Sequence, residues 1–531
     1  MRQEEIGASA CLLRDALSFW PSRSAFSSGI FFAVFPGTRS SSLLEEGRCR
    51  RLRSEDDQKR VERGLLPLTD EKVAMKNDRI FPWICLLGLS LWLAAPSRCF
   101  PSLYEVPEEN PFLHPYLGTG HAMVHANSSN SDFTMNTVGD AFERRWRALG
   151  CMSIPTSASI APDGTVWTTT GQVDAYPNPE DGCVSRLRPE DRERYLSLPP
   201  GHHVWRLDPE TGERLFSSGL VDAGAAFSSP VIDREGNVYV ADFDTLFKFD
   251  ASGNLLWEHG IDHPIITNNL LLSGDVIGID IWGFAFVLDR ETGVEIDRIR
   301  LAGTADLEPH LFCDPETREN ETFDPWFIDE AIFCYVSGAF VGSEESPPVS
   351  NTPAVSPRSG AIYTTSVCDG AGGKTACLVR LDDDPQSHAL HETWEYIFSE
   401  HVPESSEEIS ATSPALMPDD RIVVADGANY LHVVRPDGTN DWFVKLPGEK
   451  LLGSPSVDAY GNIYTGGDPL TSYDSEGNLR FSASVAGRGI VTVTGNGKLV
   501  ITTGPHPAEH PAGLSTYRLT TLDQRGKILA Q

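Results

Sequence analysis

A short unit of sequence that recurs seven times constrains the fold of this chain more than any other feature. Its clearest copy runs from residue 228 to residue 260 and holds two turn signals, Asp233–Asn237 and Asp250–Asn254, each flanked by short apolar or alternating runs. Aspartate favours the start of such a turn because its carboxylate accepts hydrogen bonds from nearby backbone amides, and glycine favours its end because the chain passes there through positive φ. Four strands and tight turns in 33 residues predict one four-stranded antiparallel sheet, the unit of a β-propeller.

The second clear copy, residues 453–485, matches the first nearly position for position, with turns at Asp458–Asn462 and Asp474–Asn478. Looser copies occupy residues 157–220, 264–301, 351–398, 411–447 and 489–531. Because an isolated four-stranded sheet leaves apolar faces exposed, the units are expected to stack radially and close into a ring. We therefore predict an all-β fold, a propeller of seven blades, with eight as the alternative.

Two parts of the chain bear on the blade count and on ring closure. Residues 302–350 contain no clean copy of the unit, but they are long enough to hold an eighth blade. Closure of a propeller commonly takes one strand from the opposite terminus. The segment Phe142–Gly150 resembles the end of a unit and could supply that strand.

The recurring pattern, (S/T)-x-P…D-x-x-G-N-x-Y…L-x-x-x-D-x-x-G-x-x-x-W, resembles the PQQ-like, or quinoprotein-type, propeller repeat over roughly residues 157–531. The resemblance implies the fold but no activity, because the superfamily includes enzymes and plain scaffolds alike. Its enzymes hold a flat tricyclic quinone over Ca²⁺, with an aspartate as base and stacked apolar or disulfide groups around the ring. This chain has no adjacent Cys-Cys pair, no C-x-x-C-H haem motif and no Gly-Lys before the repeat tryptophan. No cofactor is therefore expected, with PQQ or calcium as the minor alternative.

The acidity of the chain limits its partners. It carries 43 Lys+Arg against 75 Asp+Glu, a formal net charge of −32. Residues 1–74 hold 12 basic and 11 acidic side chains, so the acidity lies almost wholly in the repeats. A field of this sign repels nucleic acid and anionic membrane surfaces, and it favours cationic partners or bound cations. Many of the acids are the turn aspartates, whose place in the turns already accounts for them.

The apolar run Ile80–Ala95 follows Lys76 and Arg79 and precedes small residues, a pattern typical of a secretory signal peptide. Its 16 residues are fewer than the ~20 that a membrane span needs. Because a signal peptide begins a chain, we infer that translation starts at Met75. The predicted division is residues 1–74, a disordered extension or gene-model artefact; 75–99, a signal peptide or, if uncleaved, a membrane anchor; 100–150, a segment that packs on and closes the propeller; and 151–531, the PQQ-like propeller.

Cysteines and glycosylation sequons agree with export. An even number of cysteines after the signal region favours a disulfide framework. Six cysteines allow 15 arrangements, and sequence proximity favours three local pairs: Cys151–Cys183, Cys313–Cys334 and Cys368–Cys377. The sequons at Asn127 and Asn320 lie in expected loops and are predicted glycosylation sites.

Two groups of residues could bind a metal ion, and each has a simpler structural interpretation. Asp382, Asp383 and Asp384 offer hard oxygens suited to calcium, but no segment reproduces a calcium loop with its distal glutamate. His114, His121 and His125 precede the propeller, where Gly118 and Gly120 favour a loop over a helix. We interpret this stretch as an irregular segment that packs across one face of the ring, with a metal or ligand site as the alternative. No catalytic or metal-binding residue is assigned.

Two further features have structural interpretations as well. Trp257, Trp282 and Trp442 are interpreted as aromatics that pack between blades. The acidic stretch Ser399–Glu408 is expected to be a solvated link between blades, with recognition of a basic partner as the alternative.

Two functional hypotheses follow. The first is a secreted, monomeric, non-catalytic propeller that binds an unidentified protein or small-molecule ligand, but no nucleic acid, through one face. The insertions at residues 172–202 and 302–350, with the segment 100–140, would shape that face. The alternative is an extracytoplasmic quinoprotein-like oxidoreductase with its site at the central channel. A binding module predicts a plain or plugged channel, whereas an enzyme predicts several Asp, His or Arg side chains at one channel mouth.

Overall fold

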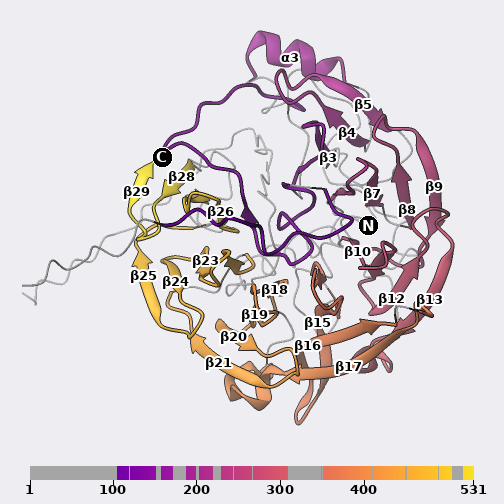
Figure 1. Ribbon diagram of the computed structural model, residues 1–531, viewed down its shortest axis with the longest axis vertical. Coiled ribbons are helices and arrows are strands. Elements are labelled where there is room, and N and C mark those ends of the chain that lie inside the picture. Colours follow the sequence, from indigo (N-terminus) through magenta and orange to yellow (C-terminus); the bar gives the residue numbers. More distant parts are fainter. Residues whose placement is uncertain are drawn as a thin grey trace, which may run out of the picture. The chain divides into compact units, whose positions relative to one another are not determined.

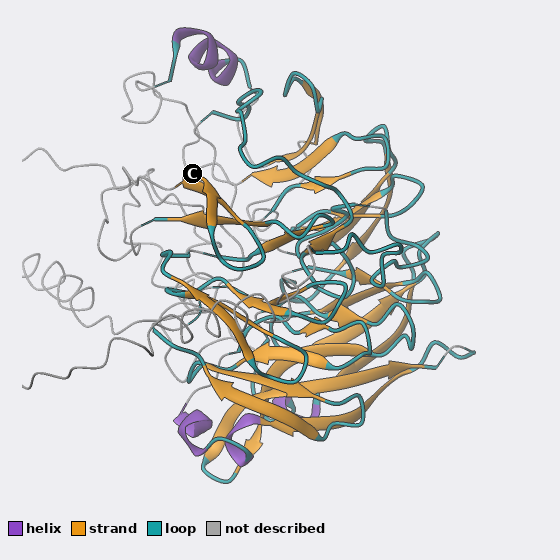
Figure 2. Cartoon of the chain, turned by 60° about the vertical axis from the view of Figure 1, so that its left-hand side comes forward, coloured by secondary structure: helices purple, strands orange, loops and turns teal. Residues whose placement is uncertain are grey.

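The described part of the chain forms one ring of β-sheets. The computed structural model describes residues 104–118, 120–150, 157–170, 187–198, 203–218, 229–242, 244–265, 267–308, 348–349, 351–384, 386–407, 411–448, 451, 453–487, 489–504 and 518–531, all within one compact unit. Seven antiparallel sheets stand as blades around a central axis (Figure 1). Strands dominate Figure 2, and α3 (Pro189–Leu196) is the only α-helix of the described residues. The predicted signal segment and the extension before it lie outside the described ranges.

Each blade is built from four strands that follow one another in the chain, and the first strand is the innermost. Blade 1 contains β2 (Ser159–Ile160), β3 (Val166–Thr170), β4 (His203–Leu207) and β5 (Arg214–Ser218). Blade 2 contains β6 (Val231–Ile232), β7 (Val238–Ala241), β8 (Thr245–Phe249) and β9 (Leu255–Gly260). Blade 3 contains β10 (Asn269–Leu270), β11 (Val276–Ile279), β12 (Phe284–Leu288) and β13 (Glu295–Arg300).

The remaining four blades repeat this order. Blade 4 contains β14 (Ala354–Val355), β15 (Ile362–Gly370), β16 (Gly373–Asp383) and β17 (Leu390–Ile397). Blade 5 contains β18 (Ala415–Leu416), β19 (Ile422–Ala425), β20 (Tyr430–Val434) and β21 (Asn440–Lys445). Blade 6 contains β22 (Ser456–Val457), β23 (Ile463–Thr465), β24 (Leu470–Tyr473) and β25 (Leu479–Ala483). Blade 7 contains β26 (Thr492–Thr494), β27 (Leu499–Thr503), β28 (Arg518–Leu522) and β29 (Ile528–Ala530), with β1 (Phe133–Thr134) added at its inner edge.

The turn chemistry predicted from the repeat is present in atomic detail. In blade 2, Asp233 Oδ1 accepts the Asn237 backbone N–H at 2.8 Å, and its Oδ2 accepts the Asn237 amide at 2.8 Å and the Tyr239 hydroxyl at 3.0 Å. Asp458 of blade 6 makes the same three bonds, to Asn462 and Tyr464. The D-x-x-G-N-x-Y pattern therefore encodes a carboxylate that fixes the turn and ties it to the second strand.

One contact recurs at six blade junctions: an aromatic ring covers a glycine of positive φ in the turn between the third and fourth strands of the next blade. A Cβ on these glycines would lie 2.5 to 2.9 Å from the ring, so only glycine fits. The pairs are Trp146–Gly212, Phe216–Gly253, Trp257–Gly293, Trp394–Gly438, Trp442–Gly477 and Phe481–Gly526. The packing role predicted for Trp257 and Trp442 is thus confirmed, whereas Trp282 lies in the turn between β11 and β12.

The expected seven blades are confirmed, and an eighth blade between blades 3 and 4 is excluded. Blades 3 and 4 share one apolar cluster, which joins Ile277 and Val287 to Val355 and Leu381. The Leu390 N–H of blade 4 also donates to the Asp297 carboxylate of blade 3 at 2.7 Å. Because these two sheets pack directly on each other, no further blade lies between them.

Ring closure uses a different strand from the one expected. The inner strand β1 pairs in parallel with β26, with Phe133 opposite Val493 and Thr134 opposite Thr494. The expected segment, Phe142–Gly150, forms no strand, so that prediction was wrong. Its Trp146 nevertheless takes the junction role of a last-strand aromatic, because the ring covers Gly212 of blade 1 and the indole donates to the Pro209 carbonyl at 2.8 Å.

Candidate binding face

The antiparallel order of the strands gives the propeller two unlike faces. One carries the turns between first and second strands and between third and fourth strands, and we call it the turn face. The other carries the turns between second and third strands and all links between blades, and we call it the insertion face. The predicted insertions at residues 172–202 and 302–350 both leave and rejoin the described strands at the insertion face.

The N-terminal segment covers part of the turn face. Tyr104 packs beside Gly497 of blade 7 and against the Tyr460 ring of blade 6, at a centroid distance of 5.3 Å. Leu117 bridges to Asp233 of blade 2, whose neighbour Arg234 donates its N–H to the Tyr116 carbonyl. Residues 104–118 thus lie over the turn face, opposite the insertions.

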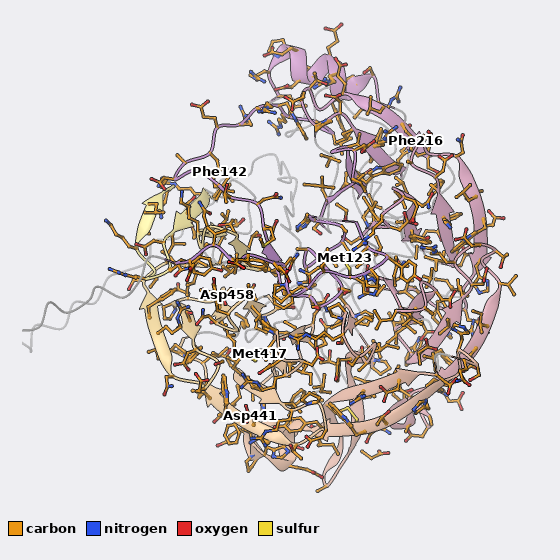
Figure 3. All side chains as sticks on the ribbon, in the orientation of Figure 1. Met123, Phe142, Phe216, Met417, Asp441 and Asp458 are labelled. Atoms are coloured by element: carbon orange, nitrogen blue, oxygen red, sulfur yellow. A yellow bond between two sulfur atoms is a disulfide. The ribbon has the colours of Figure 1, made fainter. Side chains whose placement is uncertain are left out.

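The same segment then fills the centre of the ring, and we call residues 121–132 the plug. Six backbone carbonyls of the plug each accept an N–H from the inner strand of a different blade, at 2.6 to 2.9 Å. The donors are Ile160, Ile232, Val355, Leu416, Val457 and Val493, and the acceptors are His121, Ala122, Ser128, Ser129, Ser131 and Asp132. Residues 122–132 are buried, and Figure 3 places Met123 near the middle of the ring. The channel of this propeller is occupied by its own chain.

A buried ionisable pair closes the plug on itself. The His125 Nδ1 atom lies 3.1 Å from Asp132 Oδ2, and the Asp132 N–H donates to the His125 carbonyl at 3.0 Å. Burial raises the pKa of Asp132, against the opposing effect of His125. Both residues have positive φ, at 64° and 55°, a conformation that side chains other than glycine rarely adopt. Partners in the blades therefore hold the plug in a shape that its own residues disfavour.

The structure divides the three histidine candidates between the turn face and the plug, and it gives two of the three aspartates hydrogen-bond partners. His114 lies on the turn face, where its carbonyl accepts from Arg234, while His121 and His125 belong to the plug rather than to a segment across one face. Burial lowers the pKa of His114 and of His121 to about 4. Asp382 pairs with Arg380 at 2.7 Å, and Asp384 accepts backbone bonds in its own turn. Within the described ranges, no three His, Cys, Asp or Glu side chains are grouped to hold a metal ion.

The structure speaks against glycosylation at Asn127. Its side-chain nitrogen, the atom that would carry a glycan, is buried and donates to Ser131 Oγ at 2.8 Å and to the Phe133 carbonyl at 3.3 Å. Asn320 lies outside the described residues, as do Cys151, Cys183, Cys313 and Cys334. The predicted Cys368–Cys377 disulfide is present, with Cα atoms 5.8 Å apart.

We expect folded protein from a glycosylating host to carry no glycan on Asn127. Asn127→Gln should lower the free energy of unfolding by about 1–2 kcal/mol, because buried partners lose their bonds. Peptide mass spectrometry and denaturant titration check both statements. Ser129→Ala destroys the same sequon without touching the Asn127 side chain. The peptide that contains Asn127 should have the mass of the unglycosylated form in this variant as well. A glycopeptide at Asn127 in folded protein would contradict the buried placement.

Among the described residues of the insertion face, the longest hairpin is that of blade 4, formed by β15 and β16, which we call the finger. Its strands have 9 and 11 residues, against 4 or 5 in the middle strands of blade 5. The Cys368–Cys377 disulfide joins the two strands near the tip. In Figure 1, β15 and β16 lie at the lower side of the ring between blades 3 and 5.

The finger forms hydrogen bonds to two inter-blade links. One is the start of the link from blade 3 to blade 4, and the other is part of the link from blade 4 to blade 5. Lys374 donates to the Gly303 carbonyl at 2.8 Å and pairs with Asp306 at 2.6 Å, which fixes the 3₁₀ turn η3 (Ala302–Thr304) that leads into the long insertion. On the other side, Thr375 Oγ1 donates to the Ser405 carbonyl at 3.3 Å, within η6 (Pro403–Glu407) of the predicted acidic link. The Ser405 hydroxyl in turn donates to the buried Asp426 carboxylate. Part of the acidic link is therefore anchored rather than fully solvated.

Two neighbouring carboxylates beside the finger make the stability of the folded protein depend on pH. Burial, together with the Glu392 carboxylate, raises the pKa of Glu395 on β17 to about 7. A carboxyl group whose pKa is raised on folding binds its proton more tightly in the folded state, so stability falls as pH rises from the unfolded value near 4.5 to about 7.

We expect Glu395→Gln to raise the free energy of unfolding at pH 8 by about 1 kcal/mol, because the partly exposed site is screened by solvent. At pH 4, where the carboxyl is protonated in both states, the variant and the native chain should unfold alike. Denaturant titrations at the two pH values measure the difference. Glu258→Gln, at an exposed position on β9, is the matched control and should show no such pH-dependent gain.

Comparisons with known proteins concern the fold. No model of a known protein family matches the chain, and no curated protein matches it. Similar solved structures include a quinohemoprotein alcohol dehydrogenase from Comamonas testosteroni (12% identity, 77% of this chain and 72% of that one, TM-score 0.48). Others are a europium-containing methanol dehydrogenase (12%, 80% and 86%, TM-score 0.49) and BamB from Moraxella catarrhalis (13%, 65% and 79%, TM-score 0.37). The chain is a seven-bladed β-propeller.

The plug is the central structural element that sequence reasoning missed. Its signal in the sequence is a run of small polar residues, Asn127–Asp132, placed directly before an isolated apolar Phe133. Such residues fit a narrow space lined by backbone, because their side chains bond to main-chain groups over short distances.

None of the helices in the described ranges is long and apolar enough to span a membrane.

Proposed function

We propose that this chain is a secreted, non-catalytic β-propeller that binds a partner protein through its insertion face. The observation that carries the proposal is the plug. An enzyme of the alternative kind needs its reacting groups on the axis, and residues 121–132 occupy that axis with backbone bonded to six blades. What remains for recognition is a rigid ring with variable loops, the usual arrangement of a binding scaffold.

Three features support the insertion face over the turn face. The links of greatest length all begin there, the finger projects there, and the opposite face is partly covered by residues 104–118. The residues around the finger are mainly acidic: Asp306, Asp369, Glu392, Glu395, Glu400 and Glu404, against Lys374 and Arg300. A partner with a basic surface fits this charge.

Site-specific photocrosslinking in the native host tests the proposal. A photoreactive residue at Gly372, where nothing lies within 4 Å of an added Cβ, reports on the finger tip of the insertion face. The same residue at the exposed Ser252, in the third–fourth turn of blade 2, is the matched control on the turn face. We expect a discrete adduct from position 372 alone. Adducts from position 252 alone, or stoichiometric retention of added PQQ and Ca²⁺ after dialysis, would overturn the proposal.

Export gives a separate prediction. If residues 75–99 act as a cleaved signal peptide, the purified native protein should begin between Arg98 and Phe100, a few residues before the first described residue, Tyr104. N-terminal sequencing with intact mass before and after reduction measures this, and three disulfides add six protons on reduction. A chain that starts at Met1 with free thiols would contradict secretion.

A further inference from the structure

Blade 3 is the one blade whose innermost strand gives the plug no backbone hydrogen bond in the described structure. The N–H that corresponds to those of Ile232 and Val355 belongs to Leu270, and it bonds instead to the side chain of Asn269 at 2.8 Å. The plug turns away from the wall at this point, because Ala126 donates to Met123 and Asn127 to His125 within the plug itself. It rejoins the wall at Ser128, whose carbonyl accepts from Val355.

Blade 3 also departs from the repeat at this place. The residue before the innermost strand is proline in four blades, at positions 230, 353, 414 and 455. In blade 3 it is Asn268, which is fully buried and has neither its amide nitrogen nor its amide oxygen hydrogen-bonded within the protein. A buried amide without partners lowers stability, whereas the proline found at this position in four blades has no side-chain polar group to satisfy.

Unpartnered polar atoms also occur on four buried residues of the plug. They are His125 Nε2, Ser128 Oγ, Ser129 Oγ and Asn130 Oδ1, each on a side chain that is at most 1% exposed. Asn269 of blade 3 donates to the Ser128 carbonyl at 3.2 Å, which places Ser128 beside blade 3, whereas Asn130 donates to the Thr352 and Pro414 carbonyls beside blades 4 and 5 at 3.0 Å. Buried polar groups in folded proteins are otherwise nearly always paired.

We propose that ordered water molecules bind on the propeller axis between blade 3 and the plug and complete the hydrogen bonds of Asn268 and Ser128. Water suits the site because Asn268 offers an N–H donor and a carbonyl acceptor and Ser128 offers a hydroxyl, and none of these groups carries a charge. A buried water typically makes about three hydrogen bonds to groups of this kind. The site is independent of the insertion face, and it stands whether or not that face binds a partner.

The sign of a stability change tests the proposal. If water bonds these groups, Asn268→Pro and Ser128→Ala each remove hydrogen bonds and should lower the unfolding midpoint by about 2 °C. If the groups have no partner, both substitutions remove a penalty and the midpoint should rise. Ser131→Ala is the matched control, because the Ser131 hydroxyl has protein partners in Asn127 and Phe133 and its loss must lower the midpoint in either case.

Two further measurements separate water from an ion. Unfolding midpoints of the native chain in NaCl, KCl and choline chloride at equal ionic strength should agree, since water binding does not depend on the cation. A midpoint that rises with the concentration of one cation would identify an ion and overturn the assignment to water. A high-resolution crystal structure should show density for water within 3.2 Å of Asn268 and of Ser128 or Ser129. Raised or unchanged midpoints in Asn268→Pro and Ser128→Ala would equally overturn the proposal.

Discussion

Replacing Trp257 with alanine is expected to lower the free energy of unfolding by about 4 kcal/mol, the usual cost of removing a buried aromatic side chain. The ring lies over Gly293 at the junction of blades 2 and 3, within the cluster that includes Tyr239 and Phe286. Its indole N–H donates to the Arg290 carbonyl at 2.9 Å. Truncation therefore opens a cavity between two blades and leaves a turn carbonyl without its partner. Denaturant titration measures the loss.

Two matched variants separate the ring from its hydrogen bond. Trp257→Phe keeps an aromatic ring, as Phe216 and Phe481 do at other junctions, and should cost only about 1 kcal/mol for the lost bond. Gly293→Ala forces a Cβ to within 2.7 Å of the indole and should cost less in the Trp257→Ala background, where the ring is gone. If the Phe variant proves as unstable as the Ala variant, ring packing is not what holds the junction.

The blades could be predicted from the sequence because their information is local. Asp233 and Asp458 act on residues four and six positions away, so each turn is complete within one unit. The count of seven follows from the number of such units. The junction glycines are also visible in the repeat, although the sequence alone does not reveal that each lies beneath an aromatic ring of the preceding blade.

The plug could not be predicted from local pattern, because its conformation is imposed from outside. Asn130 and Asp132 hold positive φ, and their partners lie far along the chain: Asn130 donates to Pro414, 284 residues on, and Asp132 accepts from Ser456, 324 residues on. The prediction of the strand that closes the ring fails for a related reason. A two-residue strand such as Phe133–Thr134 has no periodicity to detect, whereas the longer Phe142–Gly150 segment looked like a strand and supplies only Trp146.

The candidate site was predicted in outline only. The insertions were visible as gaps between repeats, and the strand order then decides that they share one face. The Cys368–Cys377 bond was predictable because the two cysteines flank a glycine-rich turn. The finger's hold on both links was not, since it depends on Lys374 reaching the backbone of Gly303, 71 residues away.

A chain that lacks residues 104–136 is expected not to fold into a stable monomer. Deletion removes, among other contacts, the six backbone hydrogen bonds between the plug and the inner strands, one from each blade except blade 3, together with the buried side chains of Phe112, Met123 and Phe133. At about 1 kcal/mol for each bond and about 2 kcal/mol for each side chain, the loss is on the order of 10 kcal/mol. A typical domain has only about 5–15 kcal/mol in total. Size-exclusion chromatography and denaturant titration of the deletion variant measure the effect.

The control and the rescue make this test specific to the plug. Deletion of residues 1–99 alone, which leaves the plug and β1 intact, should keep the unfolding midpoint of the mature chain. A synthetic peptide of residues 104–136 added to the deletion variant should restore a monomeric, cooperatively unfolding ring, because the inner strands present the same N–H donors to it. A deletion variant that stays monomeric with an unchanged midpoint would show that seven blades close without help. The plug would then be free to leave the axis. The channel would be open to PQQ and Ca²⁺, whose binding the proposed function excludes.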